Sequence, residues 1–181
     1  MFATGTLIAL ALAASAPALV CRLAPPARHI VLAELFSSEG CDACPPAERF
    51  FNGLKADGEI VPVVWHVDYF DDQGWKDRFA LAESSHRQQA LAQAQPGAKI
   101  VATPQVFLDG RGFAGWRDAR AFRSRVLRSA TPAGALLLAL AHIERAGVNL
   151  RLELRVEGAS AALRWQAVLL QSGLVSRVTG G

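Results

Sequence analysis

The feature that most constrains this chain is a pair of cysteines, Cys41 and Cys44, between an apolar segment and an amphipathic one. The apolar segment, residues 30–36, contains β-branched residues and leads into polar, loop-forming residues at positions 37–40, as a strand that ends in a loop does. After the proline pair at positions 45–46, apolar residues recur at helical spacing. Proline is tolerated in the first turn of a helix because N–H groups there have no intrahelical acceptor. The sequence therefore predicts a dithiol where a strand leads into the N-terminus of a helix.

The position of this dithiol favours redox chemistry. A cysteine attacks as its thiolate, and a helix N-terminus or a Cys-X-X-Cys pair lowers the free thiol pKa from about 8.5 to roughly 3.5–7.5. We expect Cys41 to be the nucleophile and Cys44, one turn along, to be the resolving thiol. Asp42 places a negative charge beside the thiolate, which favours a couple of intermediate rather than strongly oxidising potential.

The segments that follow alternate between strand and helix patterns. We predict a strand at 60–68, a helix at 78–95 ended by Pro96-Gly97, short strands at 105–108 and 111–115 around Asp109-Gly110, and a basic helix at 118–129. The order β-α-β-α-β-β-α predicts an α/β sandwich over residues 29–130.

Beyond residue 132 the pattern changes. Residues 148–156 alternate between apolar and polar side chains, which is typical of a half-buried strand. Residues 135–143 also suit a helix, but a turn-like sequence after them favours a hairpin arm, and residues 163–170 are predicted to form a further strand. Residues 133–181 are therefore expected to form a small, β-rich, antiparallel C-terminal lobe.

The N-terminal residues predict export. Residues 2–20 carry no charged side chain and end in small residues, so we interpret 1–28 as a signal or leader with its connector, cleaved near Ala18, and expect a periplasmic or secreted protein. No Lys or Arg precedes the apolar run, and its length approaches the roughly 20 residues of a membrane span, so a transient or permanent membrane anchor stays open.

Composition excludes other classes of function. The net charge is +3, but acidic and basic residues are interspersed without a lysine-rich tract, so no nucleic-acid partner is expected. Three cysteines are too few for a disulfide scaffold, and Cys21 has no assigned role. Because no second cysteine pair exists and the four histidines are scattered, we expect no metal and no cofactor. The expected partners are protein or small-molecule thiols and disulfides.

His66 and Asp68 lie on the same side of the predicted strand by two-residue alternation. Such a pair near a dithiol could relay a proton. A hydrogen-bonded pair that supports the following loop explains the residues equally well, because buried polar groups are usually satisfied. Both interpretations stay open.

A threonine and a proline, Thr103 and Pro104, begin a predicted strand about sixty positions after the cysteines. This arrangement resembles the thioredoxin superfamily, in which a cis-proline faces the dithiol and the residue before it offers backbone hydrogen bonds to a cysteine-containing peptide. The resemblance implies a thioredoxin-like α/β sandwich in which Thr103 and Pro104 form a wall of the substrate site. A plain turn before a strand is the alternative.

Several blocks of sequence carry a closer match. The segments 33–48, 66–71 and 74–77, together with Thr103-Pro104-Gln105-Val106, resemble the bacterial domain-of-unknown-function family 1223. That family is thioredoxin-like, often exported and without a settled biochemical role. The resemblance is strong over about residues 30–116 and weak in the tail. Family members continue past the point where this chain stops, so the C-terminal lobe is expected to be incomplete.

The leading hypothesis is an envelope thiol–disulfide oxidoreductase that acts through a mixed disulfide at Cys41. One alternative is a thioredoxin-fold binding module without turnover, which holds a partner protein or a soft metal such as Cu(I) or Zn(II) through both thiolates and His66. The other is a static structural disulfide.

Overall fold

The computed structural model describes residues 19–21, 29–54, 58–97, 99–129, 137–146, 149–157, 166 and 168–178. The chain divides into two compact units. The larger comprises Pro26–Gly134 with Arg164–Gly181, and the smaller comprises Met1–Pro25 with Ala135–Leu163. The predicted leader, residues 1–18, and its cleavage site near Ala18 lie outside the described residues. No helix in the described part of the chain is both long enough and apolar enough to cross a membrane.

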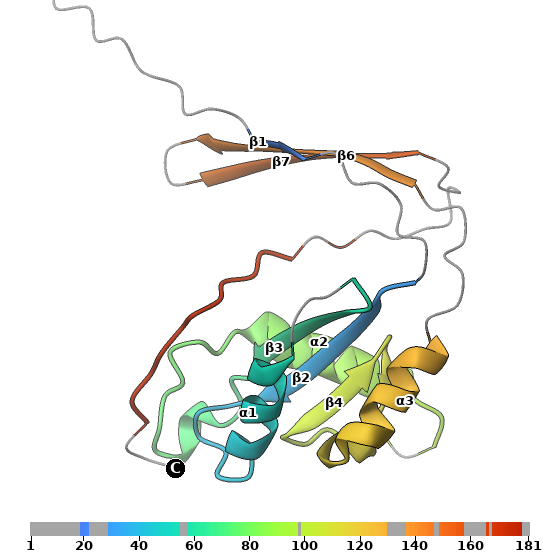
Figure 1. The fold of residues 1–181 in the computed structure, drawn as a ribbon. Helices are drawn as coiled ribbons and strands as arrows, with labels where there is room; N and C mark the ends of the chain where they lie inside the picture. The colour runs from blue at the N-terminus through green and yellow to red at the C-terminus, as the bar shows by residue number, and fades with distance from the viewer. Residues whose placement is uncertain are drawn as a thin grey trace, which may run out of the picture. The chain divides into compact units, whose positions relative to one another are not determined.

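The larger unit is built on a mixed sheet in the order β3-β2-β4-β5 (Figure 1). The central strand β2, Val31–Ser37, pairs in parallel with β3, Ile60–His66, and antiparallel with β4, Gln105–Leu108. Strand β5, Arg111–Gly112, pairs antiparallel with β4 at the edge. The C-terminal ends of β2 and β3 and the N-terminal end of β4 therefore meet at one end of the sheet.

Helices cover both faces of this sheet. Helices α1, Pro45–Gly53, and α3, Ala119–Ser129, lie on one face, and α2, Ala82–Gln93, lies on the other (Figure 1). Two short 3₁₀ turns, Asp71–Gln73 and Ala114–Arg117, complete the unit. The predicted α/β class is confirmed, and the four-stranded mixed sheet with three helices is consistent with a thioredoxin-like α/β fold.

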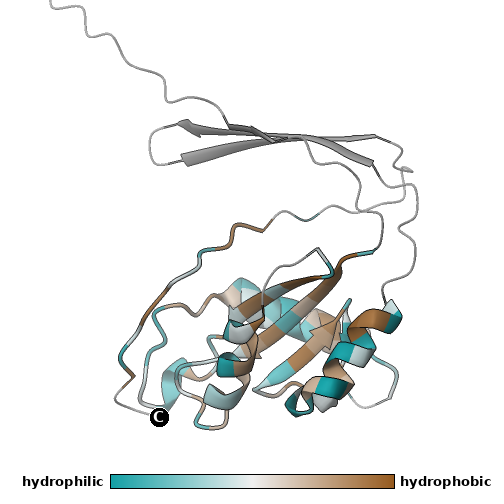
Figure 2. Cartoon of the chain, in the orientation of Figure 1, coloured by the Kyte–Doolittle hydropathy of each residue, from teal (hydrophilic) through white to brown (hydrophobic). Residues whose placement is uncertain are grey.

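The core follows from side-chain alternation along β2. Val31, Ala33 and Leu35 are fully buried among apolar side chains of α1 and α3, and Phe36 is fully buried in a second cluster with Val67 and Phe107. Apolar residues therefore colour the strands of this sheet along most of their length in Figure 2. A strand that is covered on both faces positions the loop after it rigidly, and that loop carries Cys41.

Local sequence signals set the element ends. Asp109 and Gly110 have φ values of 50° and 72°, as both central residues of a type I′ hairpin turn require. Asp118 Oδ1 accepts hydrogen bonds from the N–H groups of Arg120 and Ala121, 2.9 and 3.0 Å away, and so caps α3. The predicted helix at 78–95 is shorter in the structure, where it spans Ala82–Gln93. The N–H groups of Phe79 and Leu81 donate to Asp77 Oδ1 and His66 O instead.

The smaller unit is an antiparallel sheet in the order β1-β6-β7. Its strands are β1, Leu19–Cys21, β6, Leu137–Ala146, and β7, Asn149–Glu157, so the predicted C-terminal hairpin is confirmed. The strand predicted at 163–170 is wrong within the described residues, where Gln166 and Val168–Leu170 have no regular structure. Leu169 and Leu170 border hollows of the larger unit instead of pairing with a strand.

Candidate functional site

Cys41 and Cys44 form a disulfide, with an S–S distance of 2.15 Å and Cα atoms 5.4 Å apart. Both side chains are buried, with 5% and 0% of the residue exposed. The loop after β2 closes in two turns, in which Cys41 N–H donates to Ser38 O and Cys44 N–H donates to Cys41 O, each over 3.1 Å. Cys44 is the N-cap residue of α1. The pair therefore lies at the strand-to-helix junction that the sequence predicts.

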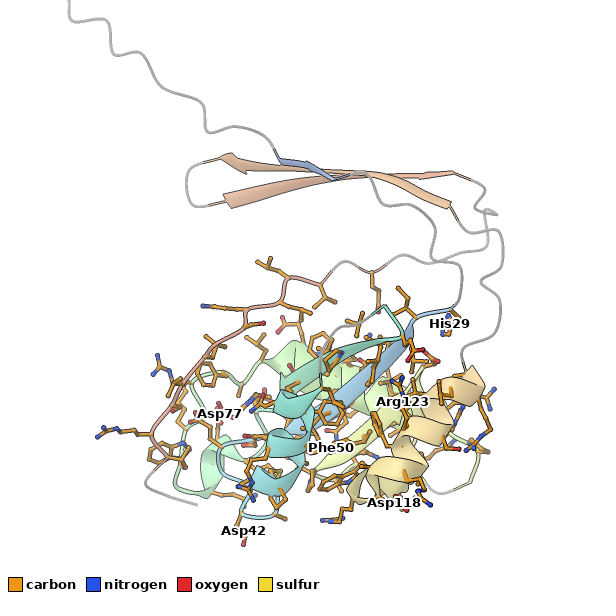
Figure 3. The ribbon with its side chains drawn as sticks, in the orientation of Figure 1. His29, Asp42, Phe50, Asp77, Asp118 and Arg123 are labelled. Atoms are coloured by element: carbon orange, nitrogen blue, oxygen red, sulfur yellow. A yellow bond between two sulfur atoms is a disulfide. The ribbon has the colours of Figure 1, made fainter. Side chains whose placement is uncertain are left out.

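The start of α1 offers fewer free donors than a helix N-terminus normally does. Pro45 and Pro46 have no N–H group, and the next two, from Ala47 and Glu48, already donate to Cys44 O over 2.9 and 3.1 Å. A negative charge at the start of α1 would therefore meet the helix dipole but few free N–H donors. Asp42, between the cysteines, is exposed and points away from the unit (Figure 3).

A buried ion pair lies next to the disulfide loop. His66 Nδ1, at the end of β3, is 2.6 Å from Asp77 Oδ2. The Asp77 side chain is fully buried and also accepts the backbone N–H groups of Glu39 and Phe79, each over 2.8 Å. Figure 3 shows where Asp77 lies in the unit. One carboxylate thus ties the disulfide loop to the end of β3 and to the loop before α2.

His66 and Asp77 shift each other's pKa. Burial alone would lower the pKa of His66, but the hydrogen bond and charge of Asp77, together with the charges of Glu48 and Glu39, raise it above its usual 6.5. Burial alone would raise the pKa of Asp77, but the hydrogen bonds from His66, Glu39 and Phe79 lower it below its usual 3.8. The pair therefore favours a protonated imidazole beside a carboxylate.

His66 and Cys41 border the same cavity of about 320 Å³. Five further residues from the sheet, helix and loop part of the unit line this cavity: Ser38, Glu39, Pro45, Glu48 and Phe79. The rest of its lining is Leu174, Val175, Ser176 and Val178. Glu48 is fixed by a 2.5 Å hydrogen bond from Ser37 Oγ to its Oε1. The site thus combines a disulfide, an imidazole and two carboxylates.

The other predicted site residues occupy different places. Asp68 does not pair with His66, because its carboxylate accepts from Ser85 Oγ over 2.5 Å while Ser85 Oγ also accepts the N–H of Asp68. The Thr103–Pro104 peptide bond is cis. Because Gln105 pairs with Phe36, Pro104 lies at the end of the sheet where β2 leads into the disulfide loop. Neither Thr103 nor Pro104 lines the cavity that His66 shares with Cys41.

A second buried polar cluster holds the backbone before β4. Gln88, with 0% exposed, accepts from Tyr69 Oη over 3.0 Å and donates to Ala102 O and Gln105 Oε1 over 2.7 and 2.8 Å. Burial raises the pKa of Tyr69, and the hydrogen bond with Gln88 offsets part of the rise. This cluster fixes the segment that contains the cis bond.

Sequence reasoning missed the roles of Asp77, Glu48 and Gln88. Asp77 falls inside a block that carries the family resemblance, which was the available signal, but nothing local indicates that His66 binds it. Glu48 ends the block 33–48 of the same resemblance but looks like an ordinary charge in the first turn of a helix, and Gln88 looks like a polar residue within one. Across the described ranges, no three histidine, cysteine or acidic side chains are grouped as metal ligands would be.

Comparisons with known proteins place these features in context. A family model described as a protein of unknown function, DUF1223, matches residues 32–181. No curated protein matches the chain. A crystal structure of an Agrobacterium tumefaciens protein is 31% identical, with a TM-score of 0.50, over 65% of this chain and 56% of that one. The chain therefore spans little more than half the length of that protein.

Proposed function

We propose, for a chain that belongs to the DUF1223 family of proteins of unknown function, that the Cys41–Cys44 pair works as a thiol–disulfide oxidoreductase. The observation that carries this proposal is the position of Cys41, which is bonded to Cys44 and also borders a cavity shared with His66. A disulfide that only stabilised the fold would not need a titratable side chain such as His66 beside it at a cavity. The finer assignment of Thr103 and Pro104 as a substrate wall belongs to the same proposal.

The reaction exchanges one disulfide for another. In the reducing direction, the Cys41 thiolate attacks one sulfur of a partner disulfide, forms a mixed disulfide and releases the other partner sulfur as a thiolate. The Cys44 thiolate then attacks the Cys41 sulfur, which restores the Cys41–Cys44 bond and releases the second partner thiolate. Two electrons pass from the chain to the partner. The oxidising direction runs through the same mixed disulfide in reverse.

His66 is suited to handle the proton in these steps. Asp77 engages Nδ1, so Nε2 is the ring nitrogen left to exchange a proton at the cavity. A protonated His66 stabilises the Cys41 thiolate by its charge and protonates a departing thiolate in the next step. Asp77 holds the ring in place and is a positioning residue in this scheme.

Export belongs to this proposal as well. An apolar leader that ends in small residues would carry the chain into the periplasm or the medium, where disulfides persist. There the partners would be thiols and disulfides of envelope proteins or of small molecules.

A trapping experiment tests the function. In cells expressing the full chain with Cys21→Ser and Cys44→Ser, the mixed disulfide at Cys41 has no resolving thiol and should accumulate with its partner. The Cys41→Ser, Cys21→Ser chain is the matched control and should capture nothing, because Cys44 is fully buried. Protein partners should appear on non-reducing gels and small-molecule partners as added mass on the intact chain, and both should disappear on reduction. An absence of disulfide-linked partners in both strains would contradict the proposal.

A further inference from the structure

The last described segment of the chain, residues 168–178, has no helix or strand but clusters with the larger unit. It runs beside that unit as an extended stretch (Figure 1). Its apolar side chains fall into two groups. Those of Val168, Leu170, Leu174 and Val178 are 46–50% exposed, whereas those of Leu169 and Val175 are 82% exposed. The first group is therefore more buried against the unit than the second.

The segment is held at several points. Leu170 and Leu174 border a hollow of about 400 Å³ beside Phe51 and Leu54 of α1 and Val63 of β3. Upstream, Arg87 Nη1 donates to Gln166 Oε1 over 2.8 Å. Arg87 is itself fixed, because its Nε lies 2.5 Å from the fully buried carboxylate of Glu34. Apolar contact and a hydrogen bond from an anchored side chain thus fasten the segment to the unit.

The end of this segment borders the cavity beside the disulfide. Leu174, Val175, Ser176 and Val178 line it opposite Cys41 and His66. A group that approaches Cys41 through this cavity therefore passes the segment. A small thiol needs little more than the cavity itself, whereas a polypeptide would have to displace the half-buried side chains of Leu174 and Val178.

We propose that Leu174 and Val178 determine which partners reach Cys41 through the cavity that it shares with His66. Their side chains form a wall of this cavity, so that it admits small thiols and disulfides and excludes polypeptide. The proposal rests on the proposed function in that it names which partners reach the disulfide. Pro104 and Thr103 do not line this cavity, so a polypeptide partner would meet the disulfide away from the wall.

Alkylation of a single thiol tests the wall. The full chain with Cys21→Ser and Cys44→Ser keeps Cys41 alone, which is treated with iodoacetamide or with a maleimide coupled to a long polyethylene glycol. Leu174→Ser should raise the rate with the bulky reagent by about fivefold or more, as loss of a half-buried leucine contact predicts, and change the iodoacetamide rate by less than about twofold.

The matched control is Leu169→Ser, which makes the same change at a side chain that is 82% exposed and does not line the Cys41 cavity. It should leave both rates unchanged. Equal effects of the two variants, or a Leu174→Ser effect of the same size with both reagents, would overturn the proposal. Circular dichroism and thermal unfolding of both variants verify that the unit stays folded.

A second measurement uses the intact disulfide. The reduction rates of Cys41–Cys44 by 2-mercaptoethanol and by a thiol-terminated polyethylene glycol should show the same selectivity, again relaxed by Leu174→Ser and unaffected by Leu169→Ser. Both measurements report access to sulfur and need no turnover with a cellular partner. If trapping fails but the size selectivity is observed, only the proposed function is contradicted. If trapping succeeds but no size selectivity is observed, only the role of Leu174 and Val178 is contradicted.

Discussion

Two buried polar clusters meet at the same end of the sheet, and they are built from different chemistry. At the end of β3, His66 and Asp77 form an ion pair that also holds the disulfide loop. Before β4, Gln88 and Tyr69 form a cluster of amides and a phenol that holds the backbone at Ala102. The first cluster contains groups whose charge changes between acid and neutral pH, and the second stays uncharged across that range.

Because one cluster is charged and the other is neutral, the two clusters serve different tasks at the same end of the sheet. The ion pair lies beside a cavity that Cys41 also borders, and in the proposed reaction its charge acts on the sulfur. The amide cluster borders the loop of the cis bond and supplies shape without charge. Damage to either cluster should cost stability, but damage to the ion pair alone should alter how the site responds to pH.

The largest expected effect is from Asp77→Ala. The change leaves the protonated His66 and the N–H groups of Glu39 and Phe79 without their acceptor in a buried place, so we expect the free energy of unfolding to fall by about 3–5 kcal/mol. Urea unfolding followed by tryptophan fluorescence measures this. Asp42→Ala, at an exposed carboxylate, should cost less than about 0.5 kcal/mol, and similar losses in the two variants would argue against the role of the buried pair.

A smaller loss of unfolding free energy is expected for Gln88→Ala. One fully buried amide loses two hydrogen bonds that it donates and one that it accepts, and the backbone before Pro104 loses its support, which should lower the free energy of unfolding by about 2–3 kcal/mol. The same urea experiment at several pH values sharpens the comparison. The loss should stay constant between acid and neutral pH, and a loss that varied with pH would contradict the uncharged character of this cluster.

The pH dependence of stability separates the clusters further. The raised pKa of His66 means that its contribution is fully present below its unfolded pKa of about 6.5 and is lost as the pH rises through the folded pKa. The lowered pKa of Asp77 means that its contribution is present above about 3.8 and is lost as the pH falls through the folded pKa.

The stabilisation of the pair should therefore be greatest between these limits. We expect the difference in unfolding free energy between the wild-type chain and His66→Gln to shrink above neutral pH. Denaturation curves measured from pH 4 to pH 9 check this. A difference that grew with rising pH would contradict the assigned direction.

The smallest expected effect is from Glu48→Gln. Its carboxylate borders the Cys41 cavity, and a like charge beside a thiolate disfavours ionisation, so the change should raise the alkylation rate of Cys41 about two- to threefold at neutral pH. The chain with Cys21→Ser and Cys44→Ser is used for this measurement. Glu83→Gln, at an exposed position on α2, is the control and should change nothing. A lower rate in Glu48→Gln would mean that Glu48 acts on the sulfur through the protonation of His66 instead.

Much of the larger unit could be predicted because its signals are local. The order of strands and helices, the turn at Asp109-Gly110 and the position of the cysteines all follow from periodicity, turn residues and prolines. The early start predicted for α2 fails for a non-local reason. Leu81 N–H donates to His66 O over 3.1 Å, and Phe79 N–H donates to an Asp77 carboxylate that His66 and Glu39 hold in place, so these residues stay outside the helix.

The candidate site also has a part that local sequence signals predict and a part that they do not. The sequence by itself determined that Cys41 and Cys44 would flank the start of a helix, because strand, loop and helix signals adjoin there. Only the tertiary structure decided that His66 would pair with Asp77 rather than Asp68, and that residues 174–178 would border the sulfur. Backbone preferences act over a few neighbouring residues, whereas the partner of a buried charge depends on which loops the packed sheet and helices bring to the same end.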